Sequence, residues 1–154
     1  MWGVELEVNA RPVKGLDLFG SVAYNNDSYR SLIPGSEAAV ANARNLPLVS
    51  EWQARLGATF EQAVGDTLLV RLGGNMNYTG PYSSAVNNVL DLPGWTRIDA
   101  FIALATQNRK WELNLSGQNL TDEVTYVGGI VAGLPPALTP LRPRTWMMML
   151  KFNY

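Results

Sequence analysis

The chain has 154 residues, which is enough for one domain or for one part of a larger one. It is 47% hydrophobic and only 16% charged, and its net charge of -1 excludes the basic field of a nucleic-acid-binding protein. It contains no cysteine and no histidine, which excludes disulfides, thiolate metal sites, most zinc chemistry and the commonest general base. Most enzyme classes are therefore not expected.

Two kinds of targeting or membrane segment are not expected. The first five residues, MWGVE, carry neither the basic nor the apolar region of a signal peptide. The longest apolar runs, such as Trp146 to Leu150, are far shorter than the roughly 20 residues of a membrane helix.

The dominant pattern along the chain is alternation with a period of two, which predicts β-strands with two different faces. Seven segments carry it, at about 2–10, 16–25, 51–61, 68–78, 97–105, 111–118 and 145–154. One face of these strands holds only apolar residues, glycine and aromatic residues. The other face holds every strand charge, namely Glu5, Glu7, Asp17, Glu51, Arg55, Glu61, Arg71, Arg97, Asp99, Glu112 and Lys151.

The connections between the predicted strands alternate in length. Those near 11–15, 62–67 and 106–110 are short, and those near 26–50, 79–96 and 119–144 are long and rich in Gly, Pro, Asn and Ser. All nine prolines are expected between strands, where no ladder donor is lost. The sequence therefore predicts an all-β, antiparallel up-and-down meander of about seven strands, with the long loops at one end.

Alternation alone does not decide which face meets water, because a soluble β-sandwich also sorts apolar from polar residues. Three features favour a transmembrane barrel. Several strands have the length of about 9–11 residues that crosses a bilayer, and short turns opposite long loops are typical of outer-membrane barrels. The aromatic residues also form two predicted girdles. The first, at the long-loop end, contains Trp2, Tyr24, Trp52, Tyr78, Trp95 and Trp146, and the second contains Phe60, Trp111, Phe152 and Tyr154.

Several segments resemble a known family. The stretch from Trp111 to Asp122 (WELNLSGQNLTD), followed by Tyr126, by Pro143-Arg144 and by a closing strand that ends at Tyr154, resembles the C-terminus of TonB-dependent outer-membrane receptors. Gly15 to Tyr24 and Gly94 to Asp99 resemble late barrel strands of the same family. The resemblance covers essentially the whole chain.

The resemblance implies residues 1–154 to be the C-terminal segment of a 22-stranded transmembrane β-barrel, with an assembly signal, wall strands and three extracellular loops. It implies energised uptake of a scarce ligand, most often a ferric siderophore. The partners implied are outer-membrane lipid, the barrel assembly machinery and a TonB-type energiser. The plug, the TonB box and most of the barrel are not in this chain. A passive porin-like barrel and a soluble β-sandwich binding module remain alternatives.

Few residues are candidates for a site. Leu150, Phe152 and Tyr154 resemble the assembly signal, while Tyr82, Tyr126, Arg142 and Arg144 are possible contacts to a ligand from the long loops. Asn119 and Asp122 are expected to bond to their own backbone in a turn. Paired charges such as Arg97 and Asp99 are expected to form salt bridges in the barrel lumen. No catalytic, metal or cofactor site is expected.

Overall fold

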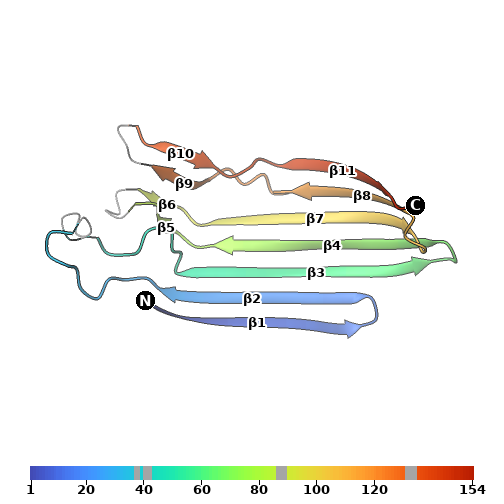
Figure 1. Cartoon of the computed structure of the whole chain (residues 1–154), viewed down its shortest axis with the longest axis horizontal. Coiled ribbons are helices and arrows are strands. Elements are labelled where there is room, and N and C mark those ends of the chain that lie inside the picture. The colour runs from blue at the N-terminus through green and yellow to red at the C-terminus, as the bar shows by residue number, and fades with distance from the viewer. Residues whose placement is uncertain (37–38, 40–42, 86–89, 131–134) are drawn as a thin grey trace.

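The computed structural model describes residues 1–36, 39, 43–85, 90–130 and 135–154. Its main element is one seven-stranded sheet in which every neighbouring pair is antiparallel (Figure 1). In spatial order the strands are β1 (Trp2–Val13), β2 (Leu16–Asn26), β3 (Trp52–Val64), β4 (Leu68–Thr79), β7 (Trp95–Thr106), β8 (Trp111–Gln118) and β11 (Thr145–Phe152). The all-β meander of seven strands predicted from the sequence is confirmed.

The connections also alternate in length as predicted. The short turns lie at one end of the sheet and the long loops at the other (Figure 1). Two of the short turns use glycine in the left-handed region, with φ of 85° at Gly15 and 61° at Gly65, which glycine tolerates because it has no Cβ. Among the described residues, no helix is long and apolar enough to cross a membrane.

Two small sheets, which the sequence analysis did not predict, lie within the long loops. One pairs β5 (Tyr82–Ser83) with β6 (Asp91–Leu92), and the other pairs β9 (Tyr126–Ile130) with β10 (Ala137–Pro140). These strands have two to five residues each, too few to show a period of two in the sequence.

Two prolines correct the expectation that every proline lies between strands. Pro12 lies inside β1, where the pairing register shifts between Ala10 and Val13, and Pro140 lies inside β10, also at a register shift. Both occupy irregular positions at which the ladder lacks a regular hydrogen bond, so the missing N–H costs little.

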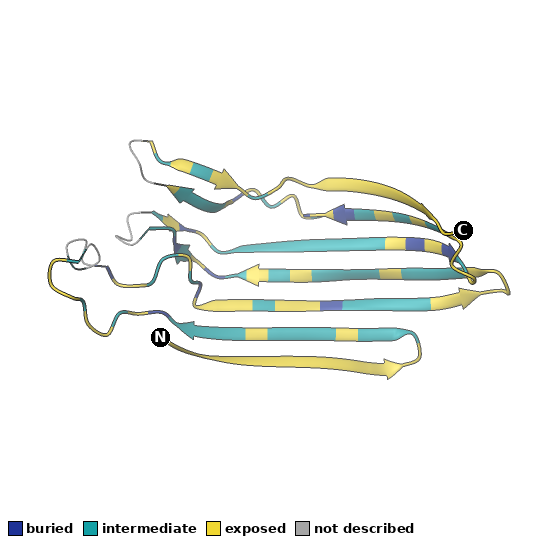
Figure 2. Cartoon of the chain, viewed as in Figure 1, coloured by how far each residue is buried: buried dark blue, intermediate teal, exposed yellow. Residues whose placement is uncertain are grey.

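The burial of the sheet is the reverse of that of a soluble protein. On β7, Ile102 and Leu104 are 52% and 45% exposed, whereas Ala103 and Ala105 on the opposite face are 2% and 8% exposed. The edge strands β1 and β11 are exposed along their whole length (Figure 2). A soluble sandwich requires a second layer over the apolar face, and the described residues place none there. The burial therefore favours the transmembrane barrel over the soluble sandwich.

Candidate functional site

The sheet presents two continuous faces, an apolar face and a polar face, and the pairing register defines both. For example, Leu6 on β1 pairs with Val22 on β2, and Val22 pairs with Ala54 on β3. These three residues form a row of apolar side chains across three strands. The polar face carries every predicted strand charge except Glu51, which immediately precedes β3. The predicted separation of charged and apolar residues onto opposite faces is confirmed within the strands.

Aromatic side chains cluster at both ends of the apolar face. At the long-loop end the ring centroids of Trp2 and Tyr24 lie 5.5 Å apart, and those of Tyr24 and Trp52 lie 4.8 Å apart. At the short-turn end, Trp111 and Phe152 are 4.3 Å apart, and Tyr154 lies 6.5 Å from Phe152. These separations are typical of favourable aromatic pairs.

Other predicted girdle residues follow the same face, with one exception. Tyr78 and Trp146 lie on the apolar face at its long-loop end, and Phe60 lies on it toward the short turns. Trp95 is a correction, because it pairs with Thr79 and therefore shares the polar face with Arg97. The prediction began this strand at residue 97, but β7 begins at Trp95, and continuing the alternation backward places Trp95 on the other face.

The polar face contains a network of ion pairs. Arg97 and Asp99 form a pair at 2.9 Å, as the sequence predicted, and Asp99 also accepts the backbone N–H of Asn119 at 2.9 Å. Arg109, in a short turn, pairs with Glu61 at 3.2 Å. The predicted pairing is confirmed for Arg97 and Asp99, and the carboxylate of Asp99 also ties β7 to the end of β8.

Two matching arrangements on the polar face, here named the stacked units, each combine a glycine, a phenylalanine and an arginine. In the first unit Phe19 on β2 lies opposite Gly57 on β3, and a Cβ at Gly57 would lie 2.6 Å from Cε1 of the Phe19 ring. The guanidinium of Arg55 lies 5.1 Å from the centroid of the same ring. The Phe19 ring therefore occupies the space that a side chain at residue 57 would fill.

The second stacked unit repeats this arrangement on the next pair of strands, β4 and β7. Phe101 on β7 lies opposite Gly73 on β4, and the guanidinium of Arg71 lies 5.8 Å from the Phe101 ring centroid. Arg71 continues across the small side chain of Ala103 and pairs with Glu112 at 2.8 Å. The alternation in the sequence predicts the charges on this face but neither stacked unit, because the partners in each unit lie on different strands.

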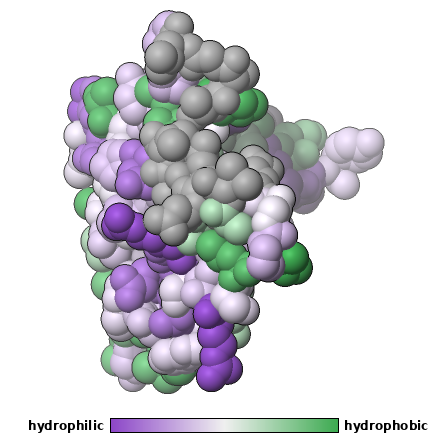
Figure 3. All heavy atoms as spheres, turned by 90° about the vertical axis from the view of Figure 1, so that its left-hand side faces the viewer, coloured by the Kyte–Doolittle hydropathy of each residue, from purple (hydrophilic) through white to green (hydrophobic). Residues whose placement is uncertain are grey.

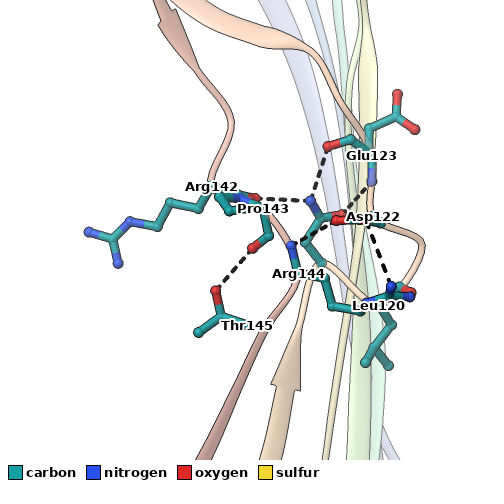
Figure 4. Close-up of polar contacts among 8 residues, drawn as sticks. Leu120, Asp122, Glu123, Arg142, Pro143, Arg144 and Thr145 are labelled. Carbon is teal, nitrogen blue, oxygen red and sulfur yellow. Dashed lines mark hydrogen bonds and ion pairs between the residues drawn. The ribbon is translucent and has the colours of Figure 1, made fainter.

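The segment after β8 forms a clasp, here defined as Asn119, Asp122 and their hydrogen-bond partners. The Asn119 side chain, 1% exposed, donates to the carbonyl oxygens of Glu123 at 3.0 Å and Arg142 at 2.9 Å, and it accepts the N–H of Glu123. Asp122 accepts the N–H of Arg144 at 3.0 Å (Figure 4). The predicted turn chemistry is confirmed for Asn119, which bonds the backbone of Glu123. It is wrong for Asp122, whose carboxylate bonds the backbone at the far end of the loop, so the clasp joins the two ends of the last long loop.

The long loops are joined to one another at their end of the sheet. Leu48 donates its N–H to the carbonyl of Ser83 at 2.7 Å, and the Tyr82 hydroxyl donates to the carbonyl of Val127 at 2.9 Å. These bonds link the first loop to the second and the second to the third. Hydrophilic and hydrophobic residues are mixed on this end of the molecule (Figure 3).

The four predicted ligand-contact residues divide into two pairs. Tyr82 and Arg144 form contacts within the loops. The Tyr82 hydroxyl donates a hydrogen bond to the third loop, and the guanidinium of Arg144 lies 3.7 Å from the carboxylate of Asp122. Tyr126 and Arg142 are exposed, and the Arg142 side chain points away from the clasp (Figure 4). The structure does not bring the four side chains into one site. In the described part of the chain, no group of three or more acidic side chains is placed to hold a metal ion.

An antiparallel sheet with an exposed apolar face, aromatic clusters at both ends of that face and a charged opposite face defines the wall of a transmembrane β-barrel. The family model described as "TonB dependent receptor-like, beta-barrel" matches residues 1–120. The chain therefore belongs to the TonB-dependent receptor-like β-barrel family, whose members are receptors of the outer membrane, and it is an outer-membrane barrel segment.

Three solved structures are similar to the chain along 99% of its length. They are BauA, the ferric preacinetobactin receptor from Acinetobacter baumannii (21% identity, TM-score 0.75), the ferric yersiniabactin uptake receptor FyuA from Yersinia pestis (18%, 0.80) and the siderophore receptor PiuA from A. baumannii (21%, 0.74). The chain spans 22%, 23% and 21% of these proteins, respectively. At this identity the likeness shows the fold. No curated protein matches the sequence.

Proposed function

We propose that the chain is the C-terminal wall segment of a receptor that takes up a ferric siderophore across the outer membrane with energy from a TonB-type partner. The observation that carries this proposal is the reversed burial of the sheet, together with the match to the receptor barrel family. Two of the three similar structures are receptors for ferric complexes and the third is a siderophore receptor, which supports an iron complex as the ligand.

The topology supports a role as one part of a larger barrel. Both edge strands, β1 and β11, run from the long-loop end to the short-turn end (Figure 1). Direct pairing between them would be parallel, so a closed antiparallel barrel requires an odd number of further strands between them. The edge strands of a second copy in the same orientation would run in the same direction as β1 and β11. They would pair with β1 and β11 in parallel, so a second copy does not complete an antiparallel barrel. Unpaired edges in lipid would cost several kcal/mol per backbone group.

The aromatic clusters and the chain end support two finer assignments within this proposal. The clusters of Trp2, Tyr24 and Trp52 and of Trp111 and Phe152 are proposed to lie at the two lipid headgroup levels. Leu150, Phe152 and the fully exposed Tyr154 are proposed as the signal for the barrel assembly machinery. Removal of Phe152 and Tyr154 from the full-length receptor is expected to lower the amount of assembled barrel, measured by heat-modifiable mobility on gels.

The exposed loop residues Tyr126 and Arg142 are proposed as the ligand contacts of this segment. Arg142 is exposed and has no ion pair with the residues that the structure describes, so it offers a cation to an anionic iron complex, and Tyr126 offers a flat ring. Tyr82 and Arg144 are already engaged in loop contacts and are proposed to shape the mouth.

The experiment is uptake of radioactive iron by cells whose receptor is the full-length protein, using a panel of ferric siderophores. Saturable uptake of one complex that stops when the proton gradient is collapsed is the expected result. Uptake that persists without the gradient would support the passive porin-like alternative and would contradict the proposal. A Phe152 and Tyr154 deletion serves as the unassembled control.

A further inference from the structure

A groove lies on the apolar face over the long-loop ends of β1, β2 and β3. Its volume is about 340 Å³, at the lower end of the range of about 300–1,000 Å³ that is typical of small-molecule sites. The residues that line it are Trp2, Val4, Leu6, Val22, Tyr24 and Trp52. All six belong to the apolar face, so the groove opens on the side of the sheet opposite to the charges.

The pairing register explains the shape of the groove. Val22 on β2 lies between Leu6 on β1 and Ala54 on β3, and the small side chain of Ala54 leaves space beside it. In the next row toward the long loops, Tyr24 pairs with Trp52. The groove therefore follows β2, with side chains of β1 along one side and Trp52 on the other.

Three aromatic rings form the outer end of the groove. The ring planes of Trp2 and Tyr24 are inclined by 57° at a centroid separation of 5.5 Å, and those of Tyr24 and Trp52 by 53° at 4.8 Å. Because neighbouring rings are tilted and not stacked flat, they serve as walls of a hollow. Tryptophan and tyrosine favour the lipid headgroup level, which places this end of the groove at that level.

The surroundings of the groove favour a hydrocarbon chain as its occupant. The protein is an outer-membrane barrel segment, and the groove is continuous with its apolar face. The lining has no charged side chain, and its only polar side-chain groups are one tyrosine hydroxyl and two indole N–H groups. A further wall strand would pair with the free edge of β1 and would lie beside the groove, not over it. Lipid is therefore what meets the groove, and a chain within it makes dispersion contacts with both walls.

We propose that this groove holds one acyl chain of a lipopolysaccharide molecule. The long loops of a membrane barrel are extracellular, so the groove at their end of the sheet faces the outer leaflet, whose main lipid is lipopolysaccharide (Figure 1). From Trp2 to Leu6 the groove follows about 13 Å of strand, which suits the upper part of one chain. Contact with mobile lipid is common to all membrane barrels, whereas this groove retains a particular chain. The inference does not depend on the ligand or the energy source of the proposed uptake.

The test counts lipids on the full-length receptor. The receptor is extracted from outer membranes in a mild detergent, washed in steps and examined by native mass spectrometry, which reports the mass and number of the lipids retained. Val22→Trp fills the groove between its walls. Met76→Trp is the matched control, because Met76 lies on the apolar face of β4, does not line the groove and has the same exposed fraction as Val22, 37%.

The wild type and Met76→Trp are expected to retain a lipopolysaccharide molecule that Val22→Trp loses. Its occupancy should fall about tenfold in Val22→Trp, because the loss of contact with about two methylene groups lowers the affinity by that factor. Val22→Ala leaves the groove open and should keep the lipid. Val22→Phe fills the groove with a smaller ring and replaces Val22→Trp if the latter does not assemble.

Four results would overturn the proposal. The first is equal retention of lipopolysaccharide in the wild type and in the filled variants. The second is an equal loss in Met76→Trp or Val22→Ala, which would assign the effect to the sheet as a whole. The third is a phospholipid as the molecule lost on filling. The fourth is a receptor dimer that becomes a monomer on filling, which would make a second copy the occupant.

Discussion

The phenyl ring of Phe101 on β7 lies over Gly73 on β4, and a Cβ at that position would lie 2.7 Å from the ring. The same relationship joins Phe19 to Gly57 two strands away. Aromatic rings that cover a facing glycine protect its backbone and fix the register of the two strands. The polar wall of the sheet is therefore built partly from packed rings and not from charges alone.

Gly57→Ala tests this packing directly. The added methyl would meet the rigid Phe19 ring and the Gly74 carbonyl at 2.9 Å, so a loss of about 1–3 kcal/mol in the free energy of unfolding is expected. Gly20→Ala is the matched control, because its Cβ would lie 3.5 Å from Leu56 Cδ1 and 3.7 Å from the Arg55 carbonyl oxygen, which are ordinary contacts. The measurement is denaturant unfolding of the full-length protein in lipid vesicles, and equal losses in both variants would contradict the packing.

The clasp predicts a graded response at Asn119. Asn119→Ala removes three hydrogen bonds and also places alanine at a φ of 51°, so a loss of about 3 kcal/mol is expected. Asn119→Gly removes the same bonds but tolerates that φ, so it should lose about 1 kcal/mol less. Unfolding midpoints of the two variants check the order. A glycine variant as unstable as the alanine variant would show that φ contributes nothing here.

The pair of Arg71 and Glu112 predicts a measurable coupling. Both side chains are partly buried, and Glu112→Gln leaves the guanidinium without its carboxylate, at an expected cost of about 1–2 kcal/mol. Once Arg71→Met is present, the same change should cost much less. A double-mutant cycle on the full-length protein gives the coupling energy, and a value near zero would mean that the pair is not formed.

A charge placed on the apolar face is expected to be far more harmful than the same charge on the polar face. Ile102→Arg places a guanidinium in the hydrocarbon region and should cost about 2–4 kcal/mol. Ser116→Arg, on the neighbouring strand and the polar face, is the control and should cost little. The yield of folded barrel in vesicles checks both. Similar losses would argue against lipid contact at Ile102.

Much of this fold follows from sequence alternation, because each main strand is long enough to show it. All seven main strands and the sorting of their charges were predicted for that reason. The boundary at Trp95 was missed because Thr96 interrupts the apolar run, and this displaced Trp95 to the wrong face. Pro12 was assigned to a turn because proline rarely enters a strand, whereas a bulge accommodates it.

The contacts between strands could not be read from the sequence. The partners in each stacked unit are 38 or 28 residues apart, as with Phe19 and Gly57 or Gly73 and Phe101, and only the register brings them together. The same holds for the bond from Asn119 to the Arg142 carbonyl. Loop residues were hardest to assign, because the sequence left both a ligand contact and loop packing open for Tyr82, and the structure shows the loop contact.

The central claim is that the apolar face meets lipid and the polar face lines the lumen. The most direct test is a spin-label scan of β4 in the full-length receptor in vesicles, comparing accessibility to oxygen, which concentrates in lipid, and to a water-soluble nickel complex. The account predicts alternation with a period of two, with oxygen contact at Leu72, Gly74, Met76 and Tyr78 and none at Arg71, Gly73, Asn75 and Asn77. Uniform accessibility, or oxygen contact on the polar face, would contradict it.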